Sequence, residues 1–265
     1  MNLNTEKVKY DDATSDALAN ACRTVAQNID NALPPLKNSL TTALEEFRGH
    51  YADVAAANID TTISDGRDIA SIFRQLADVV DRLKESAHKE NENRDLMYHY
   101  EHDLGGFRKW WVETFGGEPP KPQSYKPDTS IDTTSLGHRE STATRSGGMY
   151  ISSARPSTVR ALSNTLANLG TSFDAEPGKL RNLSTEFMVK CQWGSVDAEN
   201  LISTFEAWNK SNANDKTWLG IVADTFEKYG SSGQVITVAN STLEGAISAA
   251  GVSTERHDLE VPTPA

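Results

Sequence analysis

The sequence lacks long apolar runs and basic clusters. No apolar stretch approaches the roughly 18 residues needed to cross a bilayer, which argues against stable membrane insertion. A formal net charge of −11 argues against nucleic acid as a partner, because phosphate neutralisation needs a surplus of Lys and Arg. The opening segment, MNLNTEKVKYDD, has no apolar stretch of the kind a cleavable signal peptide needs. If the protein is exported, we expect a route that does not read such a signal.

Cysteine is scarce, and motifs of catalysis are missing. Cys22 and Cys191 each lie in a helical pattern, so we expect two buried apolar residues rather than a disulfide. Neither CxxC nor HxxxH occurs, which excludes structural zinc sites with four Cys/His ligands. His99 and His102, three residues apart with carboxylates around them, form the most catalytic-looking constellation. We expect them to be the polar face of a helix, with no metal, no cofactor and no enzymatic activity.

Residues 1–115 show helical periodicity almost throughout. Pro34-Pro35 is expected to interrupt the pattern, since proline in a helix loses a hydrogen bond. Residues 65–103 can form one continuous helix, and helices of that length are stable only against partners, so we expect an elongated antiparallel hairpin or bundle. Apolar residues recur at steps of three and four in three stretches, here called the apolar seams: Leu18, Cys22, Val25, Ile29 and Leu33; Leu36, Leu40, Leu44, Phe47, Tyr51 and Val54; Ile69, Phe73, Leu76, Val80, Leu83 and Ala87.

Composition divides the rest of the chain. Residues 116–155 are rich in Ser, Thr, Pro and Gly, so we expect a flexible, disordered linker that cannot bury a core. Residues 156–251 predict a compact bundle of short helices, one of them capped by Asn214 or Asp215. VITVA, residues 235–239, is the one strand candidate. Residues 252–265 read as a polar tail or a linker to further cargo, and the expected fold class is all-α.

Two adjacent tryptophans, Trp110 and Trp111, end the first helical block just before Gly116-Gly117. Neighbouring side chains on a helix point about 100° apart, so both rings can be buried only if two surfaces flank them. One surface can be the protein's own bundle. The other can be a partner chain or the second domain, so we interpret the pair as an anchor rather than a reaction centre.

Two stretches resemble a known family. EEFRGHYADVAAANIDTTISDGRDIASIFRQLADVVDRLKESAHKENENRD is similar to the helical-hairpin modules of actinobacterial type VII secretion substrates, relatives of the small Trp-x-Gly hairpin proteins. Phe47-Arg48-Gly49 stands at the place of the Trp-x-Gly turn, with Phe in place of Trp. CQWGSVDAENLISTFEAWNKSNANDKTWLGIVADTFEKYG resembles the helical segment of polymorphic toxins that precedes a YD/RHS-type repeat shell or a toxin domain.

The resemblance implies a targeting region that docks a small helical-hairpin protein, forms a four-helix bundle with it and engages the secretion machinery. It also implies a secreted or cell-surface location after a cytoplasmic stage, with a toxin or shell domain C-terminal to this region. None of the tyrosines has Asp or Glu four residues on, so the export signal must be composite, borrowed from a partner or of another form. The residues expected to bind the partner are Leu18, Ile29, Leu36, Leu40, Leu44, Phe47, Gly49, Tyr51, Phe73, Leu76, Val80, Leu83, Trp110 and Trp111.

This expectation assumes that the apolar seams carry more apolar surface than the hairpin can bury by itself. Two non-enzymatic alternatives stay open. One is a plug or scaffold inside a toxin shell or phage particle, contacting β-rich protein through Trp193, Trp208 and Trp218. The other is a membrane-inserting helical pore. The hypothesis that ranks last is an enzyme whose activity depends on His102.

Overall fold

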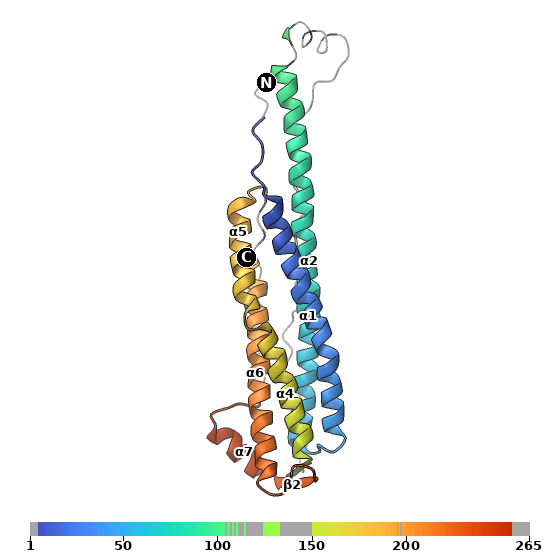
Figure 1. Ribbon diagram of the computed structural model, residues 1–265, viewed down its shortest axis with the longest axis vertical. Coiled ribbons are helices and arrows are strands. Elements are labelled where there is room, and N and C mark those ends of the chain that lie inside the picture. The colour runs from blue at the N-terminus through green and yellow to red at the C-terminus, as the bar shows by residue number, and fades with distance from the viewer. Residues whose placement is uncertain are drawn as a thin grey trace. The chain divides into compact units, whose positions relative to one another are not determined.

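The computed structural model describes residues 5–103, 105, 106, 108, 110, 114, 124–132, 150–194, 196 and 198–255. This part of the chain is mostly helical, as the sequence predicts, and none of its helices is both long and apolar enough to span a membrane. The elements are α1 (Asp12–Leu44), α2 (His50–His102), β1 (Ile151–Ala154), α4 (Pro156–Phe173), α5 (Glu176–Lys190), α6 (Glu199–Glu227), β2 (Ile236–Ala239) and α7 (Asn240–Ala249) (Figure 1).

Helix α1 continues through Pro34 and Pro35, so the expected interruption there is wrong. Each proline removes one main-chain hydrogen bond from the helix. Leu33 and Leu36, on either side of the pair, are buried, and so is Leu40 one turn further on. Tertiary packing of this apolar stripe therefore keeps the helix intact where local propensity argues for a break.

Helix α6 is also longer than expected, because no new helix begins at Asn214 or Asp215. The carboxylate of Asp215 accepts hydrogen bonds from Trp218 Nε1 at 2.8 Å and from Asn58 Nδ2 at 2.7 Å. The Asn214 amide donates to the Ser253 carbonyl at 2.8 Å. Both side chains thus serve tertiary contacts from the middle of the helix, and the predicted cap is wrong.

The chain divides into two compact units, and each unit is assembled from three segments. The sequence predicts two helical domains, residues 1–115 and 156–251, and each unit contains residues from both of them. The boundaries of these domains stay a prediction. Unit 1 comprises Met1–Arg23, Arg74–Ile131 and Leu180–Ala198, and unit 2 comprises Thr24–Phe73, Asp132–Lys179 and Glu199–Ala265.

Unit 2 is a four-helix bundle of α1, α2, α6 and α4. Lys37 of α1 pairs with Asp60 of α2 at 2.7 Å, across a hairpin closed by residues 45–49. On the other side of the bundle, Arg160 of α4 pairs with Asp224 of α6 at 2.5 Å. Ser163, one turn later on α4, donates to the carbonyl of residue 216 at 2.8 Å, so α4 and α6 run antiparallel.

The two helix pairs also meet in antiparallel fashion. Thr62 of α2 donates to Asn212 of α6 at 3.0 Å, and Phe73, further along α2, meets Phe205 with ring centroids 5.5 Å apart. Residue numbers therefore rise on α2 as they fall on α6. Every neighbouring pair of helices so far described in unit 2 is antiparallel, which is the arrangement expected of an up-and-down bundle.

The centre of this bundle is aromatic. Phe205 stacks on Trp208 at a centroid distance of 6.1 Å, and Phe173 of α4 meets both rings. Gly66 of α2 makes room for the indole, since a Cβ at that position would lie 3.0 Å from Trp208 Cζ2. The hairpin α1–α2 is thereby covered by side chains of α4 and α6.

A polar layer crosses the same core. Asn58, Thr62 and Asn212 are completely buried, and Asp215 is nearly so. The Thr62 hydroxyl donates to Asn212 Oδ1, while the Thr62 carbonyl accepts from Trp208 Nε1 at 3.0 Å. Buried hydrogen bonds of this kind can form in one helix register only. If either helix shifted along its axis, the polar atoms would lose their partners and remain unpaired in an apolar core.

Strands β1 and β2 form a two-stranded antiparallel sheet in unit 2, with Ser152 opposite Val238. Residues 151–154, which the sequence assigns to the disordered linker 116–155, are therefore a strand, and this part of the prediction is wrong. Residues 236–239, in contrast, fall in the one segment that the sequence marks as a strand candidate. Arg48, in the turn between α1 and α2, pairs with Ser153 through two main-chain hydrogen bonds of 2.7 and 3.0 Å. The sheet closes this end of the hairpin.

Unit 1 contains the other portions of the hairpin. Lys84 of α2 pairs with Asp16 of α1 at 2.7 Å, and His88 pairs with Asp12 at 2.8 Å. The numbers again run in opposite directions, so α1 and α2 are antiparallel here too. After α5, Gly194 packs so closely that a Cβ would lie 2.4 Å from a methyl carbon of Leu83.

Candidate partner-binding surfaces

Most residues of the apolar seams are buried within the chain itself. In unit 2, Ile29 and Leu33 face Gly66, and Phe47 meets Phe226 of α6 edge-to-face at 6.4 Å. The expected partner-binding residues that are buried are Leu18, Ile29, Leu36, Leu40, Phe47, Gly49, Tyr51, Phe73, Leu76, Val80 and Leu83.

The premise that these seams lack a cover within the chain is therefore wrong. In unit 2 the physical reason is that α4 and α6 supply the second helix pair that the hairpin needs, so burial there does not require another polypeptide. Partner binding through the buried seam residues stays a prediction for a state in which the covering helices separate. Leu44 is only half-buried, and Trp111 lies outside the described residues.

The end of α2 behaves differently, because it exposes large apolar side chains. Leu96 is 62% exposed and Tyr98 46%, and Trp110, further along the chain, is 51% exposed. Trp110 is thus the one expected anchor residue that the described structure leaves substantially open to solvent. Tyr98 also stacks on His102, with ring centroids 4.3 Å apart and planes 17° apart.

The histidines near this end do not converge on one point. His99 pairs with Asp103 through Nδ1, whereas His102 uses Nδ1 against the Tyr98 carbonyl at 3.1 Å. Among the residues that the structure describes, no group of three His, Cys, Asp or Glu side chains is placed to hold a metal ion. Local i,i+4 contacts on an exposed helix face account for both rings.

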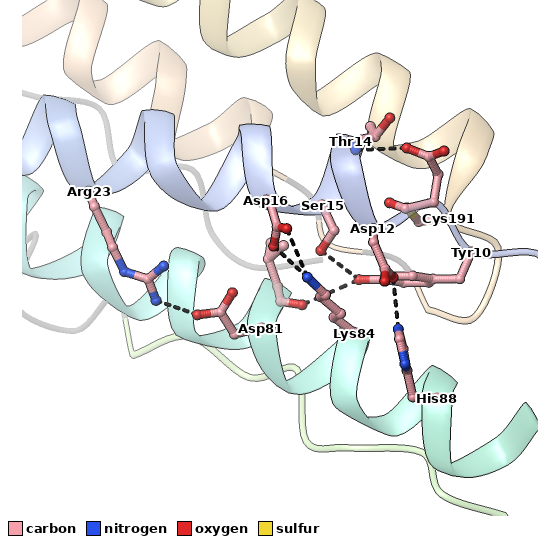
Figure 2. Close-up of polar contacts among 12 residues, drawn as sticks. Tyr10, Asp12, Thr14, Ser15, Asp16, Arg23, Asp81, Lys84, His88 and Cys191 are labelled. Atoms are coloured by element: carbon pink, nitrogen blue, oxygen red, sulfur yellow. Dashed lines mark hydrogen bonds and ion pairs between the residues drawn. The ribbon is translucent and has the colours of Figure 1, made fainter. Parts of the chain in front are cut away.

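A second polar cluster lies where α1 begins, in unit 1 (Figure 2). Asp11 caps the helix, since its Oδ1 accepts from the Thr14 N–H at 2.7 Å. The Tyr10 hydroxyl lies 2.9 Å from Ser15 Oγ, and the Cys191 thiol donates to the Asp11 carbonyl at 3.4 Å. Figure 2 shows side chains from α2 reaching across to this first turn of α1.

The cluster has the residue types of a nucleophilic site, but its pKa shifts have the opposite direction from those that activate a nucleophile. Burial raises the pKa of the Cys191 thiol, and the hydrogen bond that Lys84 donates to Asp16 raises the pKa of Lys84. A reactive cysteine or lysine needs a lowered pKa. Burial likewise raises the pKa of Tyr10 well above its usual value. The geometry serves to fasten α1 and the preceding residues to α2.

Sequence reasoning missed this cluster because its members come from three distant parts of the chain. Only the spacing of Asp11 and Thr14 carries a local signal, that of a helix N-cap. Tyr10 contacts Phe187 edge-to-face at 6.1 Å, and nothing in the sequence next to either residue predicts this contact.

Comparison of the chain with protein-family models, with curated proteins and with solved structures finds no match. The resemblance to type VII secretion substrates therefore rests on the residues quoted above. Function has to be argued from those residues and from the geometry of the described units.

Proposed function

We propose that the chain is the non-enzymatic targeting and partner-binding region of a bacterial polymorphic toxin exported by type VII secretion. Its partner is a small helical-hairpin protein of the Trp-x-Gly family. The observation that carries the proposal is the α1–α2 hairpin, whose connection contains Phe47-Arg48-Gly49 at the position of the family's turn. Gly49 has φ +97°, a backbone conformation that favours glycine, which is a physical reason for glycine at this turn.

The partner docks at the end of α2 rather than on the buried seams. Leu96, Tyr98 and Trp110 expose apolar surface there, and tryptophan and tyrosine are the residues most enriched among interface hot spots. Covering the exposed half of the Trp110 ring removes on the order of 100 Å² from water. At about 25 cal/mol per Å² this contributes about 2.5 kcal/mol to binding.

The test uses the full chain mixed with small helical-hairpin proteins encoded near it, with the mass of the complex measured by light scattering. We expect a complex with one of them, and Trp110→Ala should weaken it about tenfold to a hundredfold. Tyr229→Ala is the matched control, because this aromatic residue is also exposed but lies in unit 2. Absence of a complex with every such protein refutes the proposed partner, and equal effects of the two substitutions refute the proposed surface.

The scaffold alternative receives less support from the geometry. It requires Trp208 and Trp218 to contact a surrounding shell, yet both side chains are completely buried in unit 2. Their indole N–H groups donate within the unit, to the carbonyl of Thr62 and to Asp215. Neither ring can reach another protein while the bundle is folded.

A further inference from the structure

The segment before α1 is extended and lies on α2 within unit 1. We call residues 5–9 the N-terminal strap. Val8 makes two hydrogen bonds to a single side chain: its N–H donates to Asn91 Oδ1 at 2.7 Å, and its carbonyl accepts from Asn91 Nδ2 at 3.2 Å. One amide side chain thus bonds both the main-chain donor and the main-chain acceptor of a single residue, as a residue of a neighbouring antiparallel strand would.

The residues on either side of Val8 are held in the same way. The Glu6 carbonyl accepts from Arg94 Nη1, and the Lys9 carbonyl accepts from the Gln192 N–H at 2.9 Å. These contacts involve main-chain atoms of the strap and place no demand on its side chains. Lys7 adds an ion pair with Asp95 at 2.9 Å, in which the Lys7 side chain is largely exposed and the Asp95 side chain about half-exposed.

Arg94, one of the groups that hold the strap, is itself held by contacts in which the strap takes no part. Arg94 Nε bonds Glu90 Oε1 at 2.8 Å, and both side chains are largely buried. The guanidinium carbon lies 5.7 Å from the centre of the Trp193 ring, whose Nε1 donates to Ser86 Oγ at 2.9 Å. If the strap leaves, the Arg94 guanidinium keeps these contacts, so this donor is preorganised for the carbonyl of an extended chain.

The strap itself is weakly embedded. Glu6, Lys7 and Lys9 are exposed and Val8 is half-buried, so hydrogen bonds rather than apolar burial hold it. Segments of this kind open at low free-energy cost. Firm anchoring begins at Tyr10, whose ring packs on Phe187 and whose hydroxyl bonds Ser15. Residues 5–9 can therefore detach while α1 keeps its place.

We propose that Asn91 and Arg94 of α2, together with the Gln192 N–H just after α5, form a peptide-binding surface in unit 1, here called the groove, which the strap occupies in cis. Its ligand in trans is an extended segment of another polypeptide, with a basic residue opposite Asp95 followed by a small aliphatic residue. The seated Lys7-Val8 pair is the stand-in for that ligand. The inference does not rest on the proposed function, because its ligand is an extended segment rather than a helical hairpin.

The experiment measures binding of a fluorescent peptide with the sequence of residues 5–10, TEKVKY, to the full chain by anisotropy. Val8→Pro in the chain removes the N–H that donates to Asn91 and weakens the strap without altering the groove. We expect this variant to bind the peptide at least tenfold more tightly than the parent chain does. Circular dichroism checks that the variant keeps its helices.

Two controls locate the binding. Asn91→Leu in the Val8→Pro chain should weaken peptide binding at least tenfold, whereas Glu92→Gln, on the same turn, should leave it unchanged. A peptide with proline in place of the valine should not bind. Equal binding by the parent chain and the Val8→Pro variant, or insensitivity to Asn91→Leu, overturns the proposal. Dimers of the parent chain without peptide binding would assign the groove to exchange between copies, which also overturns it.

Discussion

Replacing Gly49 with alanine tests the contact between the turn of the α1–α2 hairpin and β1. Gly49 has φ +97°, and a Cβ there would lie 2.6 Å from the Ile151 carbonyl oxygen and 2.9 Å from Ser152 Cα. Both neighbouring atoms belong to the main chain, so no side-chain rotation can relieve the clash. The strand has to move away from the turn, which strains its pairing with Arg48.

The cost has two parts. An L-residue other than glycine in the left-handed region costs about 1–2 kcal/mol. Movement of β1 weakens the two hydrogen bonds between Arg48 and Ser153, which are 2.7 and 3.0 Å long, and each contributes about 1 kcal/mol. We therefore expect Gly49→Ala to lower the free energy of unfolding by about 3–4 kcal/mol.

Gly251 supplies the matched control, because it has φ +66° but no atom within 4 Å of the position of a Cβ. Gly251→Ala carries the backbone cost alone, about 1–2 kcal/mol. Both substitutions restrict the unfolded chain equally, so that effect cancels in the comparison. Urea unfolding followed by far-ultraviolet circular dichroism measures both free energies. Equal losses for the two variants would show that β1 does not press on the turn and would refute the reasoning.

Three further predictions concern buried groups. Because burial raises the pKa of Tyr10, the unfolded chain loses this proton first as pH rises above about 10. The parent chain should therefore lose more stability between about pH 9 and 11 than Tyr10→Phe, measured by urea unfolding; parallel profiles would contradict this. Burial raises the pKa of Cys22 to about 12 and also raises that of Cys191, so both thiols should react with a disulfide reagent at least a hundredfold more slowly than in urea. Trp208→Phe should cost about 2–4 kcal/mol through lost packing and a carbonyl left unpaired, against less than about 0.5 kcal/mol for Trp110→Phe.

Periodicity was sufficient to predict the helices because their apolar stripes are long. Leu18, Ile29 and Leu40 lie on one side of α1 and are all buried. Such a pattern is a property of one helix, so it can be read without knowing the partner. The same property explains the error over Pro34-Pro35: packing of the whole stripe outweighs a local breaker.

The residues that cover an apolar stripe do not lie near it in the sequence. The rings that bury the hairpin, among them Phe205 and Trp208, come from α6, more than a hundred residues away in the sequence. Aspartate is a residue type common at helix N-caps, so the sequence around Asp215 predicts a cap. Only the hydrogen bond from the distant Asn58 shows that Asp215 belongs to the core. The two hydrogen bonds between Val8 and Asn91 cannot be predicted from the sequence either. An asparagine side chain that bonds main-chain atoms produces no recognisable residue pattern in either segment.

Two ways of binding a partner require part of the structure to open first, and they differ in the free energy that this opening costs. Opening the hairpin seam in unit 2 exposes Phe73, Phe205 and Trp208, each worth about 2–3 kcal/mol of burial, together with the polar layer. The three rings alone amount to about 6–9 kcal/mol, which is more than half of the about 12 kcal/mol that corresponds to nanomolar binding. A partner that opens the seam would therefore lose most of its affinity to this cost.

Release of the N-terminal strap breaks four main-chain hydrogen bonds, each contributing about 0.5–1.5 kcal/mol. Five residues regain conformational freedom worth about 1 kcal/mol each, which offsets most of that loss. The net cost is a few kcal/mol at most, within reach of a modest ligand. A competing polypeptide therefore gains entry at the strap, where hydrogen bonds are exchanged for hydrogen bonds, and not at the seam, where apolar area must first be returned to water.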